Sequence, residues 1–529
     1  MAIPRSTARK IGIATLIMMA SVFLSRVLGV GRESVIAAVG GATTAVDAYK
    51  TAFALPEILN HVLASGFLSV TFIPIFARYL AQKDDAGGWR IFWTILSLGG
   101  SLLIILIATA LLAAPWVIPL LAPGRDDPHF LAMAVRMTRI VLPAQFFFFV
   151  GSLCMAVQFA KERFFLPALA PLIYNLAIIS AGVLFARRVG MEAFSWGALL
   201  GAFIGSFALQ VAGAVKLGLR WSPNFNVAHP DLRRYALLTL PLMLGLTMAF
   251  STEIFIKIFG SFLPEGAIAW LDFAFRIVML LVGFFGQAVG AASFPFLSRL
   301  AAENRIEEMN RLFNGTLRCL ALVLPMAVLF MVLREEIVRL LFEHRHFTPA
   351  DTRMTALALL GMLLGAAAFT AQTVVSRGFY AVQNTLTPAL FTSLAALVSL
   401  PLYWIGLKTL NVLGVSLAVS LSALLQVGVL YHVWNRRSRN TGSTQVYRLY
   451  ARIALLCLPL GLFLEAARRL LIRTIDPASM IGSLAVAAAI ALLFGCLCLP
   501  AARWLKMPEL QALWDKALIR LGRGRPKEG

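Results

Sequence analysis

The chain has 529 residues, of which 60% are hydrophobic and only 14% are charged, and its mean hydropathy is +0.82. Because soluble domains are about 45–50% apolar and about 25% charged, this composition excludes a soluble globular protein. The net charge of +22 lies at the ends of apolar segments and not in one basic domain. That distribution follows the positive-inside rule and speaks against nucleic acid as a partner.

Apolar runs of about 20 residues or more recur along the chain, and each can cross about 30 Å of hydrocarbon as a helix. Strand-type alternation is weak, and only helices or closed barrels satisfy every backbone group in lipid. We therefore expect an all-α polytopic membrane protein with about fourteen transmembrane helices. In chain order, the expected spans are residues 11–40, 46–80, 89–119, 131–158, 163–186, 193–217, 233–261, 267–300, 309–333, 352–381, 386–408, 413–434, 447–471 and 478–503.

The ends of the chain indicate its orientation. The first apolar run carries Arg26 and is followed by no small-residue cleavage site, so we expect a retained helix and not a signal peptide. Both the N-terminal stretch and the C-terminal tail are basic, and an even number of helices places them on one side, which we expect to be the cytoplasm. The segment REEIVRLLFEHRHFT, residues 334–348, is predicted to form a short amphipathic helix in the outer interface.

An internal repeat relates two parts of the chain. The segment AYKTAFALPEILNHVLASGFLSVTFIPIFARYLA from Ala48 aligns with AWLDFAFRIVMLLVGFFGQAVGAASFPFLSRLAA from Ala269 at a constant offset of 221 residues. We predict two six-helix lobes in parallel orientation, followed by two helices outside the repeat. The predicted boundaries are residues 1–225 for the first lobe, 226–440 for the second, and 441–529 for the last two helices and a basic cytoplasmic tail. Paired lobes with a site at their interface are a common transporter plan.

Ionisable side chains far from the ends of the spans concentrate in the first two helices of each lobe. Each costs about 2.5–3.5 kcal/mol at a helix centre, and such residues usually mark a substrate path. If these helices line the space between the lobes, that space is net positive and suits an anionic, phosphate-bearing substrate, because arginine stays charged and binds phosphate bidentately. The residues are Arg26, Arg32, Glu33, Lys50, Glu57, His61, Glu253, Lys257, Asp272 and Arg276.

Each arginine also has a purely structural interpretation. Arg26 could pair with Glu33 or Glu57, and Arg32 could snorkel to the membrane interface. Arg276 lies four residues after Asp272, so an intrahelical pair is equally plausible.

Two further segments leave alternatives open. His61 could titrate as a switch, or it could be a neutral, hydrogen-bonded histidine. The segment NTLTP, residues 384–388, offers oxygens that could hold a cation, although a turn before a helix explains it equally well. No nucleophile elbow, metal-ligand spacing or phosphate-binding loop is present in the sequence. We therefore expect no enzymatic catalysis, no metal and no cofactor, with dependence on membrane potential or a coupling cation left open.

Three stretches carry a resemblance to a known family. SRVLGVGRES, AVDAYKTAFALPEIL and SGFLSVTFIPIFARYL resemble the MurJ (MviN) family of lipid II flippases, which belongs to the multidrug/oligosaccharidyl-lipid/polysaccharide exporter superfamily. The likeness continues through APWVIPLLAPG and GFYAVQNTLTPA and spans most of the chain. It implies fourteen helices in the bacterial cytoplasmic (inner) membrane. It also implies transport of an undecaprenyl-diphosphate-linked disaccharide pentapeptide to the periplasmic leaflet, with membrane lipids as partners and cell-wall synthesis proteins as further candidates.

The resemblance also implies roles for individual residues. The two helix 1 arginines of the family fall on Arg26 and Arg32, its helix 8 arginine falls on Arg276, and its acidic residue at the start of helix 2 falls on Asp47. These arginines are the expected contacts of the substrate diphosphate. The residues expected to line the cavity are Asp47, Glu57, Asn60, His61 and Asp272.

Helix 2 departs from the family pattern. The family's LPNLLRRxFAEGAFS is here LPEILNHVLASGFLS, so Asn60 and His61 replace an arginine pair and Ser65 replaces a glutamate. The acidic residue of the family's QDxxTP segment, associated with a sodium site, is Asn384 in this chain. One contact to the diphosphate is therefore missing or weakened, and sodium coupling is in doubt.

The sequence thus favours a lipid II flippase that works by alternating access. A flippase for another polyprenyl-diphosphate-linked glycan would use the same chemistry with a different head group. A cation-coupled drug exporter predicts more buried carboxylates than arginines, the reverse of helices 1, 2 and 8. A membrane scaffold without transport activity would leave the cost of the buried arginines unexplained.

Overall fold

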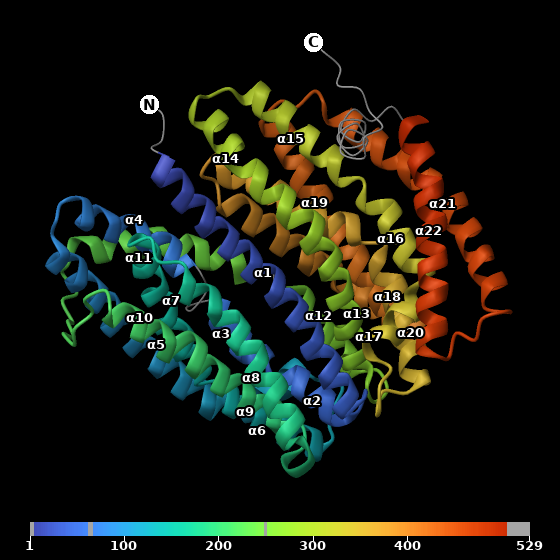
Figure 1. Ribbon diagram of the computed structural model, residues 1–529, viewed down its shortest axis with the longest axis horizontal. Coiled ribbons are helices and arrows are strands. Elements are labelled where there is room, and N and C mark those ends of the chain that lie inside the picture. The colour runs from blue at the N-terminus through green and yellow to red at the C-terminus, as the bar shows by residue number, and fades with distance from the viewer. Residues whose placement is uncertain (1–4, 62–66, 248–250, 505–529) are drawn as a thin grey trace. The chain divides into compact units, whose positions relative to one another are not determined.

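The computed structural model describes residues 5–61, 67–247 and 251–504 (Figure 1). Within these ranges all regular structure is helical, and no strand occurs. The predicted all-α class is therefore confirmed.

The first half of the chain forms helices that mostly follow the predicted spans. Their bounds are α1 (Arg5–Gly40), α2 (Thr44–Ala52), α3 (Ala54–Leu59), α4 (Phe67–Ala81), α5 (Asp85–Leu121), α6 (Pro128–Val141), α7 (Ala144–Ala160), α8 (Phe165–Val189), α9 (Glu192–Gly201), the π-helical segment η2 (Ala202–Ala208), α10 (Leu209–Val215), α11 (Pro230–Thr247) and α12 (Ser251–Ser261). Local sequence explains several starts: the Asp84 carboxylate accepts the Gly87 backbone N–H at the start of α5, and Asp127 caps α6 with Pro128 as its first residue.

The second half continues in the same way. Its bounds are α13 (Ala267–Val282), the π-helical segment η3 (Gly283–Gln287), α14 (Ala288–Ala302), α15 (Ile306–Leu320), α16 (Val323–Val332), α17 (Arg334–Phe342), α18 (Pro349–Leu363), α19 (Ala366–Ala381), α20 (Leu386–Arg437), α21 (Ser443–Leu471) and α22 (Met480–Trp504). Helix α17 covers the first part of the segment predicted as a short amphipathic helix.

The described helices support a multi-pass membrane protein. Nine helices in the described ranges are long and apolar enough to cross a membrane, and the bent pair α18 and α19 would add a tenth. The 52-residue α20 joins two helices across a kink at Asn411, where φ is 51°. The total of about fourteen spans stays a prediction.

The internal repeat is visible in the backbone. Matching pairs of residues with positive φ are separated by the same offset of 221 residues: Lys83 and Asn304, Glu162 and Gln383, Gly190 and Asn411, Gly218 and Arg439. The turns at Lys83 and Asn304 also contain equivalent hydrogen bonds. In the first, the Asp84 backbone N–H donates to the Tyr79 carbonyl, and in the second the Arg305 backbone N–H donates to the Leu300 carbonyl. Because the offset is the same at each of these turns, neither half carries a net insertion between them.

The chain forms two compact units that alternate along the sequence. Unit 1 contains the described residues up to Arg276, together with Leu341–Ala358 and Asn384–Gln426. Unit 2 contains Ile277–Leu340, Leu359–Gln383 and the described residues from Val427 onward. The lobe boundaries inferred from the repeat stay a prediction.

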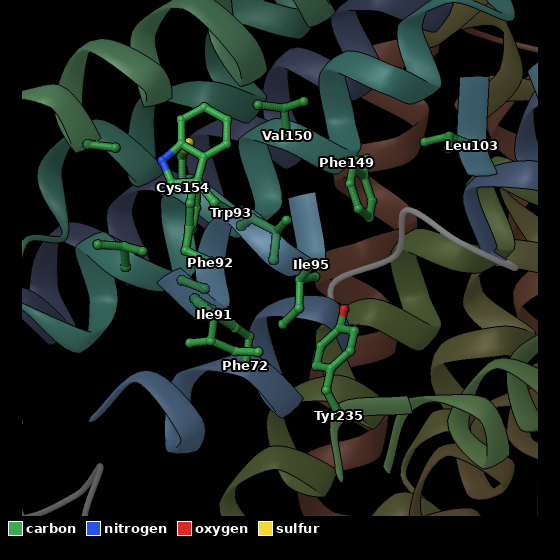
Figure 2. Close-up of a cluster of buried hydrophobic side chains, with 14 of the residues drawn as sticks. Phe72, Ile91, Phe92, Trp93, Ile95, Leu103, Phe149, Val150, Cys154 and Tyr235 are labelled. Carbon is green, nitrogen blue, oxygen red and sulfur yellow. The ribbon is translucent and has the colours of Figure 1, made fainter. Parts of the chain in front are cut away.

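Unit 1 has a core rich in aromatic side chains (Figure 2). Phe72 and Phe92 from α4 and α5 are fully buried, with ring centroids 6.2 Å apart in an edge-to-face contact. Phe149 and Cys154 from α7 are buried in the same cluster. Since lipid tails are as apolar as these side chains, shape complementarity and not exclusion from water holds the helices together within a membrane.

Unit 2 is held by polar contacts at two places. At one, Asn314 of α15 donates to the Asn440 side chain at 2.7 Å and accepts the Tyr431 hydroxyl at 2.9 Å. At the other, Arg468 of α21 pairs at 2.8 Å with Glu336 of α17, and the two side chains are 5% and 0% exposed. This ion pair fixes the short helix α17 to α21.

Candidate functional site

Five ionised side chains meet in unit 1, and we call them the charge cluster: Arg32, Glu33, Lys50, Asp272 and Arg276. The first two are consecutive on α1, Lys50 comes from α2, and the last two lie one turn apart on the same face of α13. Two consecutive helices and a third from far along the chain therefore contribute to one site.

Lysine and carboxylates form the centre of the charge cluster. Lys50 Nζ lies 2.5 Å from Glu33 Oε2 and 2.6 Å from Asp272 Oδ2, and 4.6 Å from the ring centroid of Phe273. A buried lysine with two carboxylates and an aromatic ring around it is well compensated for the loss of water.

Arg32 and Arg276 contact the same two carboxylates. Arg32 Nη2 lies 2.7 Å from Glu33 Oε1, and its Nη1 donates to Asn175 Oδ1 at 3.2 Å. Arg276 Nε lies 3.4 Å from Asp272 Oδ2 and 3.7 Å from Glu33 Oε1. The proposed intrahelical pair of Arg276 is thus present, and Glu33 is shared between the two arginines.

Exposure separates the members of the charge cluster. The side chains of Lys50, Glu33 and Asp272 are 4%, 6% and 8% exposed, whereas those of Arg32 and Arg276 are 18% and 37% exposed. Three cations and two carboxylates leave one net positive charge, and the arginines are the members open to a ligand. The arrangement suits a phosphate-bearing anion, which arginine binds with paired hydrogen bonds.

A second buried ion pair lies near the charge cluster in unit 1. Lys257 of α12 donates to Glu57 of α3 at 3.1 Å, and the side chains are 5% and 32% exposed. The predicted cavity-lining residue Glu57 thus has a cation partner that is 200 residues away in the sequence.

Asp47 organises one end of unit 1. Its fully buried carboxylate accepts the backbone N–H groups of Gly266 at 2.9 Å and Ala269 at 2.8 Å, so it caps the first turn of α13. Arg125 donates to Asp47 at 3.1 Å and to the Pro264 carbonyl at 2.7 Å. We call this end of unit 1, where Asp47 joins three chain segments, the capped end.

Backbone contacts close the capped end. Gly41 and Gly266 both have positive φ, of 64° and 83°, and each lies against another loop. A Cβ at Gly41 would meet the His346 carbonyl, and one at Gly266 would overlap the Ala42 carbonyl. Only glycine allows both the conformation and the approach.

An exposed carboxylate adds a contact at the capped end. Glu265 accepts the Thr44 backbone N–H at 2.8 Å. The hydrogen bonds from Thr44 lower the pKa of Glu265. This carboxylate therefore stabilises the closed loops at neutral pH, and its contribution is lost as the pH falls through its lowered pKa.

The remaining predicted site residues lie apart from the charge cluster. Arg26 is on the exposed surface of α1, while Asn60 and His61 are partly buried at the end of α3. The Asn384 side chain accepts the Thr387 backbone N–H at 3.0 Å at the start of α20, as expected for a turn before a helix. Ser65 lies outside the described residues.

Two functional contacts were not expected from the sequence. Arg125 lies in a loop, where no periodicity indicates a partner, and the contact with Asp47 spans 78 residues. Asn175 could have been found from the sequence, because it is an amide in the middle of the apolar run of α8. Its Nδ2 also donates to the Pro171 carbonyl.

Comparison with solved structures identifies the fold. A structure titled as the inward-facing conformation of a multidrug resistance MATE family transporter of the MOP superfamily superposes with a TM-score of 0.64 at 15% identity, covering 80% of this chain and 95% of that one. A structure titled as lipid II flippase MurJ in an inward closed conformation reaches a TM-score of 0.74 at 21% identity, covering 92% and 99%. The fold is that of helical membrane transporters.

Sequence comparison defines the family. A relative from Burkholderia cenocepacia named lipid II flippase MurJ is 27% identical over 416 residues, which cover 77% of this chain and 80% of the relative. The model of the family described as lipid II flippase MurJ matches residues 36–481. The chain belongs to this family.

Proposed function

We propose that this protein moves lipid II, the lipid-linked peptidoglycan precursor, from the cytoplasmic to the periplasmic leaflet of the bacterial inner membrane. The observation that carries the proposal is the charge cluster, which brings two arginines and one net positive charge into the apolar chain of a flippase family member. The diphosphate of the substrate is the group that such a site would bind. Charges inside a membrane are expensive, and this function explains why the chain keeps them.

The proposed orientation places both termini in the cytoplasm. The basic residues near both termini support it, since cytoplasmic segments are enriched in arginine and lysine. The capped end, held by Asp47, would then face the periplasm. A head group entering from the cytoplasm would meet the charge cluster before the closed capped end.

The proposed mechanism is alternating access, with the two halves of the repeat moving against each other. The protein would act as a transporter and not as a catalyst, without metal or organic cofactor. Its energy source would be the membrane potential or a coupling cation. Its partners would be undecaprenyl-diphosphate-linked substrate, membrane lipids and, beyond these, proteins of cell-wall synthesis.

The test is complementation of a bacterial strain depleted of its own lipid II flippase. Expression of this protein should prevent lysis and restore the amount of lipid II exposed on the outer leaflet, measured with an externally added lipid II-cleaving enzyme. Arg276→Ala should abolish rescue, because it removes the more exposed guanidinium of the charge cluster. The matched control is Arg299→Ala, which removes an exposed arginine paired with exposed Glu303 and should rescue.

One result would contradict the proposal. If cells expressing the wild-type protein at normal levels still accumulate lipid II on the inner leaflet, the protein does not flip lipid II. Rescue of another polyprenyl-linked glycan in a matched strain would then identify a different head group.

A further inference from the structure

Lys50 is the most buried member of the charge cluster, and it contacts both of its carboxylates. Its ammonium group lies 2.5 Å from Glu33 Oε2, the oxygen that the arginines do not contact, and 2.6 Å from Asp272 Oδ2, which Arg276 also contacts. At 4% exposure, Lys50 is poorly placed to meet a ligand itself. Its role must therefore be exerted through the two carboxylates.

The carboxylates occupy the positions on the arginines that a phosphate would use. Glu33 Oε1 is 2.7 Å from Arg32 Nη2 and 3.7 Å from Arg276 Nε, and Asp272 Oδ2 is 3.4 Å from the latter nitrogen. A carboxylate and a phosphate present similar oxygen pairs to a guanidinium, so the two compete for it. In the unloaded protein, the arginines of the charge cluster are thus already paired with the carboxylates of Glu33 and Asp272.

Charge balance gives this arrangement a purpose. Without the carboxylates, the three cations of the charge cluster would lie close together without counter-ions, which is strongly unfavourable away from water. With a bound diphosphate added, the negative charges outnumber the cations, and the two carboxylates need a cation other than the arginines. Lys50 is already in contact with both and has three ammonium protons to share.

We propose that Glu33 and Asp272 substitute for the substrate diphosphate on the arginines of the unloaded transporter, and that Lys50 holds these carboxylates when the diphosphate displaces them. This inference rests on the proposed function, and it makes Lys50 a positioning residue. The arginines exchange one set of anions for another, so they are never buried without a counter-ion during a cycle. An empty transporter can then return without carrying substrate back.

The proposal predicts opposite effects from neighbouring substitutions. In Glu33→Gln a competing anion is lost, so the diphosphate should bind more tightly while the rate of transport falls, because the empty form resets poorly. In Lys50→Gln both carboxylates turn fully to the arginines, so the diphosphate should bind more weakly. The double variant also lacks the Glu33 carboxylate, which competes with the diphosphate for the arginines and which Lys50 holds in the wild type. Binding of the diphosphate should therefore recover.

The experiment measures binding of undecaprenyl diphosphate to the full-length protein in lipid nanodiscs, with undecaprenol as the uncharged comparison. Lys50→Gln should weaken binding about tenfold, Glu33→Gln should strengthen it, and the double variant should return to within about threefold of wild type. Lys50→Arg keeps the charge and should bind as wild type does, which separates lost charge from misfolding. Phosphatidylglycerol is added as a competitor to distinguish the diphosphate from an ordinary anionic lipid.

A matched control uses the second buried lysine of unit 1. Lys257 pairs with Glu57 and is 5% exposed, as buried as Lys50. Lys257→Gln combined with Glu33→Gln should show additive effects, with no recovery of binding, since Lys257 forms its ion pair with Glu57 and none with Glu33 among the described residues.

The outcomes separate this inference from the proposed function. If wild type binds undecaprenyl diphosphate no better than undecaprenol, both are overturned. If wild type binds it but the double variant remains as weak as Lys50→Gln, or Glu33→Gln fails to tighten binding, only the inference on Lys50 is overturned. Recovery in the double variant supports it, because a purely structural lysine would not be rescued by removing a second charge.

Discussion

Substitution of Asp47 by asparagine should open the capped end of unit 1. The native carboxylate accepts two backbone N–H groups, from Gly266 and Ala269, and pairs with Arg125. Asparagine retains one acceptor oxygen but loses the second, and with it the charge that favours a helix N-terminus.

The structure gives the size of the effect. A hydrogen bond to a charged group contributes about 1.5–3 kcal/mol, and Asp47→Asn loses one such bond and weakens the others. We expect closure to weaken by about 2–4 kcal/mol, since Asp47 is fully buried and water cannot replace the lost contacts. The ratio of closed to open molecules should therefore fall by about 30-fold to about 1000-fold.

A buried cysteine reports the change. Ala267 is fully buried at the start of α13, so Ala267→Cys should react slowly with a membrane-impermeant maleimide added outside, in a protein whose native cysteines are replaced by alanine. With Asp47→Asn the reaction should accelerate by about 30-fold or more. Glu265→Gln is the matched control: its carboxylate also accepts a backbone N–H but is exposed, so the rate should change far less than with Asp47→Asn. Equal labelling rates with Asp47 and Asn at position 47 would refute the capping argument.

Three further expectations concern other parts of the chain. If Arg26 contacts the diphosphate, Arg26→Lys should retain part of the complementing activity and Arg26→Ala little of it; full activity of the alanine variant would remove it from the site. A disulfide between Thr43→Cys and Ala267→Cys, at the capped end, should stop lipid II transport until it is reduced, and transport at the normal rate in the oxidised protein would exclude opening of this end. Arg468→Gln should lower the free energy of unfolding by about 3–5 kcal/mol, because Glu336 is left buried without its cation. The double variant with Glu336→Gln should lose less stability than the sum of the two single variants. Additive losses in thermal unfolding would contradict the pairing.

The sequence predicted the parts of the site that depend on helical periodicity. Asp272 and Arg276 lie four residues apart, so their pairing follows from the geometry of one helix. The repeat could also be found in the sequence alone, by aligning the two segments. The same offset of 221 residues separates the positive-φ turns at Lys83 and Asn304 in the structure. A pattern that repeats along the chain requires no knowledge of the tertiary fold.

Contacts between helices that are distant in the sequence could not be predicted from such patterns. Lys257 lies four residues from Glu253, a spacing that favours an intrahelical pair, yet it donates to Glu57 on another helix. The contacts of Lys50 with Glu33 and Asp272 also depend on how α1, α2 and α13 come together, which no local spacing encodes. The π-helical segment Gly283–Gln287 interrupts a span that the sequence presents as a uniform apolar run.

The glycine contacts of the capped end have a kinetic consequence. Gly41 and Gly266 bring backbones together without adding side chains, so they bury little of the apolar surface that contributes about 25 cal/mol per Å². Each additional 1.4 kcal/mol of closure, roughly, would lengthen the lifetime of the closed state about tenfold. A seal made of close-fitting backbone can thus exclude water while its opening rate depends mainly on one carboxylate, Asp47. Such a seal can pack closely and still have a short closed-state lifetime, as a transporter requires when it must open once in every cycle.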